Sequence, residues 1–263
     1  MSTRLVVMGG GRMGEALVSG LLGAGWAQAE ECCVVEPVPA RRRELSERFP
    51  GLGVAEAPPE AEGVVLAVKP GDVAAACRAV SAAGFRRALS IAAGVTLDAL
   101  EAALGEVPVV RAMPNTAALV GAGAAAIAPG TRAGEADLAW AEEILASVGD
   151  VVRVPEDLLD AVTGLSGSGP AYVFLVAEAL TDAGVLVGLP HEVSQRLTIQ
   201  TLLGAARLLA ETGRSPQALR AAVTSPGGTT AAGLRALEAA GVRSALVEAV
   251  VAATERSREM GRA

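Results

Sequence analysis

The first half of the chain alternates short apolar runs rich in β-branched residues with alanine-rich segments, and the alternation stops near Pro155. Strands that alternate with helices of about 10–15 residues form βαβ units, whose parallel sheet is covered by helices on both faces. We therefore expect an α/β fold with a doubly wound, mainly parallel sheet. The expected strands cover residues 4–9, 32–36, 63–68, 87–92, 108–112, 123–128 and 148–154, and the expected helices cover 12–25, 40–49, 72–83 and 97–104.

From Pro155 onward long helical patterns take over. Apolar positions such as Leu202, Ala205 and Leu209 recur every three or four residues, which is typical of an amphipathic helix. The pattern predicts helices over residues 170–187, 192–212, 216–223, 230–239 and 243–260. We expect a first domain at 1–155 and an all-α second domain at 156–263. Since a domain of ~100 residues has little core of its own, we expect this second domain to complete its burial against another subunit.

The composition excludes several classes of protein. With 51% hydrophobic and 19% charged residues, the chain can offset its ordering entropy and is not disordered. The formal net charge of -7 argues against binding to nucleic acid or to a membrane surface, because both need a cationic face. The longest uncharged stretch, 112–131, contains prolines and glycines and does not predict a spanning helix. Since no export signal precedes the first strand, we expect a cytoplasmic protein that acts on a small molecule.

Metal chemistry is not expected. Three cysteines and one histidine are too few for a zinc site without carboxylates, and no cysteine pair has CxxC spacing. Cys32 and Cys33 fall in an expected strand and are interpreted as small buried hydrophobic residues. Tyr172 is interpreted as a packing residue, and His191 as an exposed residue at a helix start. With this single histidine, a Ser-His-Asp triad is not expected.

The sequence GGGRMG at residues 9–14 is a GxGxxG motif placed where a strand meets a helix. In this motif the first glycine permits a tight turn, the second lets the backbone approach a pyrophosphate, and the third permits close packing of helix on sheet. An acidic residue, Glu36, ends the second expected strand 22 positions after Gly14. The alternative is an ordinary glycine-rich turn, but the strand, the helix and the acidic residue together favour a Rossmann-like domain with a bound dinucleotide.

Two features give opposite indications of the coenzyme. The Glu36 carboxylate would accept hydrogen bonds from ribose hydroxyls and repel a 2′-phosphate, which favours NADH. Arg41, Arg42 and Arg43 favour NADPH, because arginine binds phosphate bidentately, unless they form a solvated helix face. The sequence therefore leaves NADPH and NADH open.

Three further segments, 66–70, 90–94 and 111–116, lie at the carboxyl ends of expected strands. Ligands of open α/β sheets bind outside the carboxyl ends of the strands, so we expect these segments to face the coenzyme. They include Lys69 and Asn115, the only lysine and the only asparagine in the chain. The near absence of these two residue types indicates a compositional bias against them. The remaining lysine and asparagine either have roles that arginine or glutamine could not fill or were retained by chance.

The helical half contains two segments of small residues before expected helices, 164–172 and 224–230. The second segment would bring several backbone N–H groups and two hydroxyls together at a helix N-terminus. Such a site binds a carboxylate without a cationic side chain. The alternative interpretation is a flexible loop with ordinary helix capping.

Taken together, these segments resemble the pyrroline-5-carboxylate reductase family. The segments that match, in order over nearly the whole chain, are the GxGxxG turn, AVKP at 67–70, SIAAG at 90–94, RAMPNT at 111–116, GLSGSGPAY at 164–172 and SPGGTT at 225–230. The resemblance implies an oxidoreductase that uses NADPH or NADH to reduce 1-pyrroline-5-carboxylate to L-proline, the last step of proline biosynthesis. It also implies a coenzyme domain at 1–155, a substrate-binding and dimerisation domain at 156–263, and a homodimer or ring of dimers.

The resemblance assigns roles to particular residues. Thr230 is the expected catalytic residue, because it matches a family threonine that hydrogen-bonds the ring nitrogen of the substrate. The expected coenzyme-binding residues are Gly9, Gly11, Arg12, Met13, Gly14, Glu36, Ala67, Val68, Lys69, Pro70, Ala92, Ala93, Gly94 and Asn115. The expected substrate-binding residues are Glu156, Ser225, Gly227, Gly228, Thr229 and Thr230. Two positions depart from the family: Glu36 stands where members often have Ser or Thr, and Ala222 where some have Asn.

Two other functions stay open at this point. A β-hydroxyacid dehydrogenase-like reductase shares the general layout, but it needs a lysine in or near the helical domain, and none follows Lys69. A non-catalytic dinucleotide-sensing module would use the helices only for dimerisation and would not need the anion site at 224–230. Oxidation of reduced coenzyme by pyrroline-5-carboxylate separates all three.

Overall fold

The computed structural model describes residues 3–261. The chain divides into two compact units. The first, called the sheet unit here, comprises the residues up to Ser168 together with those from Val251 onward, and the second, called the helical unit, comprises Gly169–Val250.

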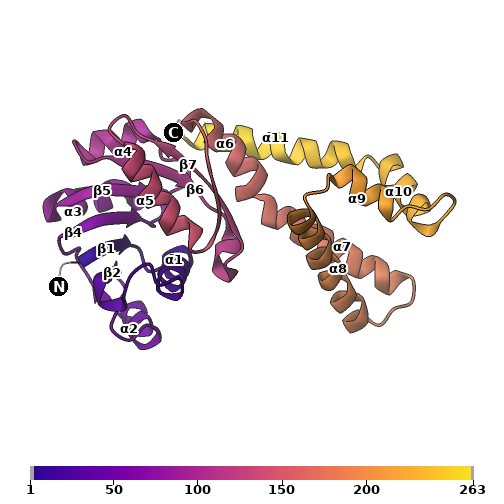
Figure 1. The fold of residues 1–263 in the computed structure, drawn as a ribbon, viewed down its shortest axis with the longest axis horizontal. Coiled ribbons are helices and arrows are strands. Elements are labelled where there is room, and N and C mark those ends of the chain that lie inside the picture. Colours follow the sequence, from indigo (N-terminus) through magenta and orange to yellow (C-terminus); the bar gives the residue numbers. More distant parts are fainter. Residues whose placement is uncertain (1–2, 262–263) are drawn as a thin grey trace. The chain divides into compact units, whose positions relative to one another are not determined.

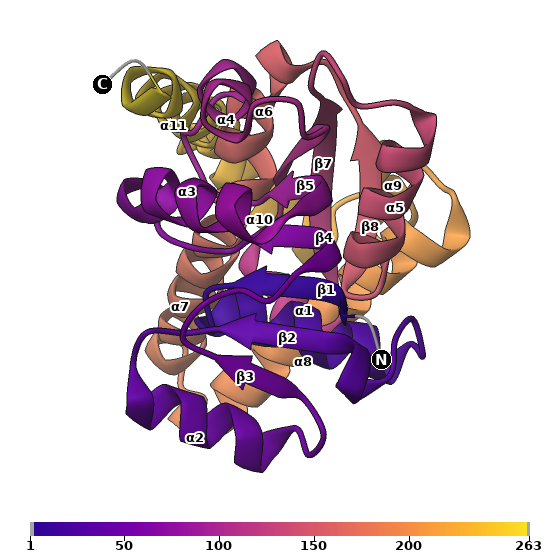
Figure 2. The ribbon, with the colours of Figure 1, turned by 90° about the vertical axis from the view of Figure 1, so that its left-hand side faces the viewer.

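The sheet unit contains an eight-stranded sheet with the order β3-β2-β1-β4-β5-β6-β7-β8. Its strands are β1 (Thr3–Met8), β2 (Cys32–Val35), β3 (Gly53–Ala55), β4 (Ala61–Leu66), β5 (Phe85–Ser90), β6 (Val109–Met113), β7 (Gly123–Pro129) and β8 (Gly149–Arg153). Neighbouring strands are parallel except for the antiparallel pair β6 and β7. Figure 2 shows β3, β2, β1, β4 and β5 one above another in this order. The expected doubly wound, mainly parallel sheet is confirmed.

Helices cover both faces of this sheet. They are α1 (Arg12–Gly23), α2 (Pro39–Arg48), α3 (Val73–Ala83), α4 (Leu97–Leu104), α5 (Glu135–Ala146) and α6 (Leu159–Val162). Leu5 and Val7 of β1 share a core with α1, α2 and α5, whereas Val6 and Met8 share the opposite core with α3, α4 and α6. Because successive side chains of a strand point to opposite faces, a strand covered on both sides is apolar throughout.

The helical unit contains α7 (Gly169–Leu186), α8 (His191–Thr212), α9 (Pro216–Ala222), α10 (Thr229–Ala239) and the start of α11 (Val242–Gly261). Helices α7 and α8 lie side by side (Figure 1). The hydroxyl of Ser194 donates a 2.7 Å hydrogen bond to the carbonyl oxygen of Thr181 between them. Many large apolar side chains of this unit are exposed, among them Val173, Phe174, Leu175, Leu186, Leu197, Ile199, Leu203 and Leu208.

All the expected strands and helices are present, and the structure adds β3, α5 and α6. The stretch 112–131 forms the end of β6, a short helical turn and β7, so no spanning helix lies there. Cys32 and Cys33 are buried with free thiols, as expected. Burial raises the pKa of Cys32 to about 11, so its thiol stays protonated and behaves as a small apolar group.

Candidate active site

The glycine-rich turn at 9–14 and the segment at 67–70 meet at the centre of the sheet. The first follows β1 and the second follows β4, and these two strands are parallel neighbours. The chain order runs outward from β1 in one direction and from β4 in the other. Such a switch point leaves a crevice outside the carboxyl ends of the strands, where α/β sheets bind their ligands.

Each of the three motif glycines has the surroundings that its role requires. Gly9 has φ +107°, and a Cβ there would lie 2.6 Å from the carbonyl oxygen of Ala67. A Cβ on Gly14 would fall well inside van der Waals contact with the carbonyl oxygen of Gly9, because α1 packs closely on β1. A Cβ on Gly11 would meet no atom within 4 Å, so this side of the turn is open. The turn fits a pyrophosphate at the start of α1.

The Glu36 side chain is buried beside the same turn. Its Oε2 accepts a 3.1 Å hydrogen bond from the backbone N–H of Gly10, and its Oε1 accepts one of 2.9 Å from the N–H of Val38. A carboxylate has about four lone-pair sites, so this group can still accept further hydrogen bonds from a ligand.

Arg41 also contacts the glycine-rich turn. Its Nε donates a 2.8 Å hydrogen bond to the carbonyl oxygen of Gly10, and its guanidinium forms ion pairs with Glu44 and Glu15. Hydrogen bonds to these two carboxylates raise the pKa of Arg41. Arg41 therefore braces the turn against α1 and α2.

The two following arginines differ from each other. Arg42 donates a 2.8 Å hydrogen bond to the carbonyl oxygen of Glu36 and lies 3.6 Å from a carboxylate oxygen of Glu56. Arg43 is exposed and forms no hydrogen bond or ion pair with any residue that the structure describes. Of the three arginines, Arg43 is the one that corresponds to a solvated helix face.

The remaining expected coenzyme residues near the turn follow three neighbouring strands. They are Arg12 and Met13 after β1, Ala67, Val68, Lys69 and Pro70 after β4, and Ala92, Ala93 and Gly94 after β5. Since β1, β4 and β5 are parallel neighbours, the sheet brings all of them to one edge. Lys69 is exposed at that edge.

The C-terminal part of α11 packs beside the segment after β5. The hydroxyl of Ser257 donates a 2.6 Å hydrogen bond to Oδ1 of Asp160 in α6. Gly94 has φ +74°, and a Cβ there would lie 3.8 Å from the Cβ of Met260. The end of α11 therefore borders the expected coenzyme residues.

Asn115 joins three segments of backbone. Its Oδ1 accepts hydrogen bonds of 3.2 Å from the N–H groups of Ala117 and Ala124, and its Nδ2 donates one of 3.1 Å to the carbonyl oxygen of Ser166. These contacts explain why the only asparagine of the chain stands at this position, because a short amide side chain both accepts and donates hydrogen bonds here. Its position near the nicotinamide stays a prediction.

Glu156 forms an ion pair with a buried arginine. Its Oε1 accepts a 2.7 Å hydrogen bond from Arg111 on β6 and one of 2.6 Å from the N–H of Leu97, the first residue of α4. The Arg111 side chain is only 9% exposed. The contact with substrate assigned to Glu156 stays a prediction. Its Oε1 already accepts two hydrogen bonds from within the protein.

We expect Glu156→Ala to lower the free energy of unfolding of the sheet unit by about 2 kcal/mol, because it leaves Arg111 buried without its carboxylate. Urea unfolding followed by the fluorescence of Trp26 and Trp140, which both lie in the sheet unit, measures this loss. Asp157→Ala is the matched control, because Asp157 is exposed and forms no ion pair or hydrogen bond within the described chain; its effect should stay within about 0.5 kcal/mol. Equal effects of the two variants would contradict the prediction.

The segment 225–230 leaves most of its polar groups available, and its internal hydrogen bond runs from the N–H of Gly228 to the carbonyl oxygen of Ser225 at 3.1 Å. Helix α10 begins at Thr229, and its N-cap is Gly228, which has no side chain to accept hydrogen bonds from the first turn. Gly227 has φ +69°, in the left-handed region that favours glycine. The side chains of Ser225 and Thr230 are exposed and form no hydrogen bond with the described residues. This helix start can accept a carboxylate.

The segment 164–172 is helical almost throughout, although a turn of small residues was expected before the helix predicted from residue 170. Thr163–Gly167 forms a π-helical turn between α6 and α7. The hydroxyls of Thr163 and Ser166 donate hydrogen bonds of 2.8 and 3.1 Å to carbonyl oxygens four residues earlier, which satisfies these side chains within the helix. Small residues with such back-bonding are compatible with a wide helical turn, so their abundance does not require a loop.

Tyr172 and His191 have the positions expected for structural residues. The Tyr172 hydroxyl donates a 3.4 Å hydrogen bond to the carbonyl oxygen of Ala249 within the helical unit. His191 is exposed at the first residue of α8. Within residues 3–261, no group of three or more His, Cys, Asp and Glu side chains is placed to hold a metal ion.

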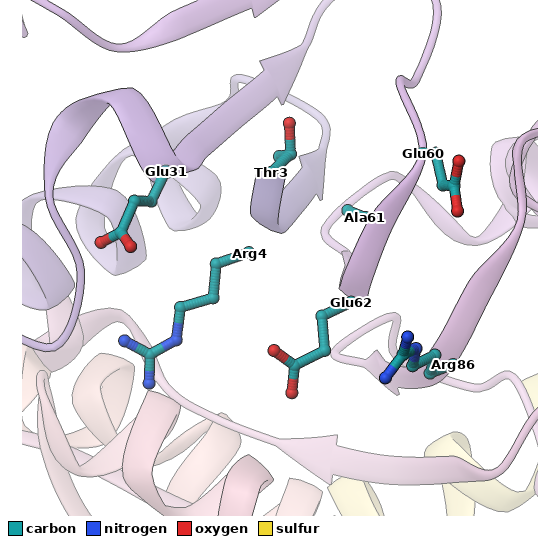
Figure 3. Close-up of a pocket in the computed structure, with 7 residues that line it drawn as sticks. All are labelled: Thr3, Arg4, Glu31, Glu60, Ala61, Glu62 and Arg86. Carbon is teal, nitrogen blue, oxygen red and sulfur yellow. The ribbon is translucent and has the colours of Figure 1, made fainter. Parts of the chain in front are cut away.

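A hollow of about 530 Å³ lies at the opposite edge of the sheet (Figure 3). It is lined by Thr3 and Ala61, the first residues of β1 and β4, and by charged side chains of both signs. Ligands of such sheets bind at the carboxyl ends of the strands, so this hollow is not the coenzyme site.

Comparisons with known proteins agree over the full chain. Residues 156–260 match the family model described as pyrroline-5-carboxylate reductase dimerisation, and residues 4–94 match the one described as NADP oxidoreductase, coenzyme F420-dependent. A pyrroline-5-carboxylate reductase from Synechocystis is 47% identical over 100% of both chains. The chain belongs to the pyrroline-5-carboxylate reductase family. The expected resemblance is confirmed.

Solved structures of reductases from this family share the fold. A pyrroline-5-carboxylate reductase from Coxiella burnetii has a TM-score of 0.92 and 36% identity, with 99% of each chain covered. The pyrroline carboxylate reductase from Plasmodium falciparum, solved with NADP bound, has a TM-score of 0.85 and 31% identity over 98% of each chain. A sheet domain followed by a helical domain is therefore the architecture of the family.

The match to a dimerisation model explains the exposed apolar side chains of the helical unit and supports an oligomeric reductase. One described helical stretch, Glu156–Leu186, is long and apolar enough to cross a membrane by length and composition, and 6% of its apolar window is buried within the chain. The whole of this stretch lies in the part matched by the dimerisation model. A subunit interface accounts for the same exposed apolar surface.

Two contacts of the site were missed from the sequence. The sequence did not indicate that the N–H of Gly10 donates a hydrogen bond to Glu36, or that Arg41 donates one to the carbonyl oxygen of Gly10. Arg111 was a usable signal, because a charged residue within an apolar strand predicts a buried carboxylate partner, here Glu156.

Proposed function

We propose that this chain reduces 1-pyrroline-5-carboxylate to L-proline with NADPH or NADH, the last step of proline biosynthesis. The observation that carries the proposal is the full-length match to pyrroline-5-carboxylate reductases, together with a glycine-rich turn whose three glycines fit a pyrophosphate. The NADP-bound relative and the NADP oxidoreductase model support the use of a nicotinamide coenzyme.

The sheet unit holds the coenzyme in this proposal. The backbone at 9–14 and the start of α1 bind the pyrophosphate, Glu36 receives the adenosine ribose, and the segments after β4 and β5, with Asn115, border the nicotinamide. The chemistry that a bound reduced nicotinamide supplies is hydride transfer to the imine carbon.

The segment 225–230 holds the substrate. Its carboxylate is bound by the N–H groups at the start of α10, Gly227 and Gly228 allow the backbone to approach it, and the Thr230 hydroxyl orients the ring nitrogen. A protonated imine is already electrophilic, so no strong protein acid is needed, and positioning provides most of the acceleration. Glu156 and Ser225 complete the proposed substrate residues.

We further propose a homodimer, alone or assembled into a ring of dimers, located in the cytoplasm. Support for the oligomer comes from the dimerisation model and from the exposed apolar side chains of α7 and α8. The functional boundary proposed at 155/156 coincides with the first residue of that model. The net charge of -7 gives no support for a nucleic-acid partner.

We expect the purified protein to oxidise NADH or NADPH only when racemic pyrroline-5-carboxylate is present. The decrease in absorbance of the reduced nicotinamide should be matched by an equal amount of L-proline, measured by chromatography. A β-hydroxy acid tested with the oxidised coenzyme should give no reaction, because no lysine follows Lys69. Coenzyme binding without turnover would instead support the sensing module.

A further inference from the structure

The surroundings of Glu36 indicate which of the two nicotinamide coenzymes this chain prefers. We propose that this chain selects NADH over NADPH and that Glu36 is the residue that determines the choice. The inference rests on the proposed function, since it concerns the adenosine end of the coenzyme that the reaction uses. Three features of the described residues carry it: a fixed carboxylate, the engagement of two arginines, and the exposure of the third.

The Glu36 carboxylate cannot turn away without loss. It is 8% exposed and held by two backbone donors, Gly10 from the glycine-rich turn and Val38 from its own segment. Rotation would leave the buried N–H of Gly10 unsatisfied, which a folded protein avoids. An ionised carboxylate only accepts hydrogen bonds, so its free lone pairs suit the two ribose hydroxyls.

A 2′-phosphate has the opposite character. It carries about −1.5 to −2 charges near neutral pH and presents only acceptor oxygens to a carboxylate. Like charges that meet in a partly buried position repel each other strongly, because water screens them little. NADPH therefore needs nearby cations to offset Glu36.

The two arginines closest to Glu36 are already engaged. Arg41 uses its guanidinium on the Gly10 carbonyl and on two carboxylates, and Arg42 uses its own on the Glu36 carbonyl and near Glu56. A phosphate would have to share each guanidinium with these partners, so neither arginine is free to neutralise it alone. Arg43 alone is without a partner in the described chain, but it is exposed, where an ion pair contributes little.

The test is a measurement of binding rather than of activity. Isothermal titration of wild-type protein with NADH and with NADPH should give a dissociation constant at least about 10-fold lower for NADH. ADP and adenosine 2′,5′-bisphosphate, which lack the nicotinamide, should show the same order. Equal binding, or tighter binding of the 2′-phosphorylated ligands, overturns the proposal. If neither coenzyme binds, the proposed function itself fails.

Variants identify the residue responsible. Glu36→Ser and Glu36→Gln should each move the ratio of dissociation constants toward NADPH by about 10-fold or more, because both remove the negative charge. The two variants differ in shape, so a fold defect in one leaves the other informative. An unchanged ratio in a folded variant that binds NADH overturns the role of Glu36.

Arg41→Ala and Arg43→Ala form a matched pair. Arg41→Ala should weaken NADH and NADPH by the same factor, because Arg41 braces the turn that both coenzymes use. Arg43→Ala should leave NADH binding unchanged within about 2-fold. Selective loss of NADPH binding in Arg41→Ala would make Arg41 a phosphate ligand and contradict the inference.

Discussion

A Gly14→Ala variant should lose about 3 kcal/mol of stability in the sheet unit, and its coenzyme binding should fall by at least about 100-fold. The added Cβ would overlap the carbonyl oxygen of Gly9 and lie 3.3 Å from a methyl group of Val7. Backbone atoms cannot move aside as a side-chain end can, so α1 must shift away from β1. Urea unfolding followed by fluorescence of the two tryptophans measures the stability, and titration with NADH measures the binding.

Gly11→Ala is the control, because it should weaken coenzyme binding without lowering the stability of the sheet unit. Its backbone has φ −69° and ψ −175°, which alanine adopts without strain, and its Cβ would meet no protein atom within 4 Å. Stability should therefore change by no more than about 0.5 kcal/mol. The methyl group would occupy the open side of the turn, so the dissociation constant of NADH should rise by about 10-fold or more. Normal NADH binding by this variant would exclude the pyrophosphate from the turn.

The long elements of the fold could be predicted from the sequence because burial leaves a strong pattern. A strand such as β1, covered on both faces, is apolar throughout, and long amphipathic helices show their period over several turns. The strand β3 has only three residues, all half-buried, which is too short for a period to appear. Helix α5 had a usable signal in the four-residue spacing of Trp140 and Ile144, both buried.

The residues of the site were easier to predict than their contacts. The spacing between the glycines and Glu36 predicts a dinucleotide turn because both lie at ends of adjacent strands. The bonds of Asn115 to Ser166 and of Glu156 to Arg111 join segments about 50 residues apart, so no local pattern encodes them. The helical turn at Thr163–Gly167 was missed because small residues favour loops and close helical packing alike.

Thr230→Ala should lower kcat for reduction of pyrroline-5-carboxylate by about 100-fold while the dissociation constant of NADH stays unchanged within about 2-fold. Thr230 lies in the first turn of α10, and its hydroxyl is exposed and unbonded among the described residues. A group that the protein does not use for its own stability is available to orient the ring nitrogen. Steady-state kinetics with saturating coenzyme measures the loss in turnover, and isothermal titration measures the binding.

Thr230→Ser separates the hydroxyl from the methyl group of the same side chain. It keeps the hydrogen-bonding oxygen, so it should recover most of the turnover that Thr230→Ala loses, and both variants should unfold at the wild-type urea concentration because the position is exposed. A rise in KM with unchanged kcat would mean that Thr230 contributes uniform binding rather than orientation in the transition state. Full turnover in Thr230→Ala would remove the hydroxyl from the mechanism and leave the N–H groups of α10 to hold the substrate alone.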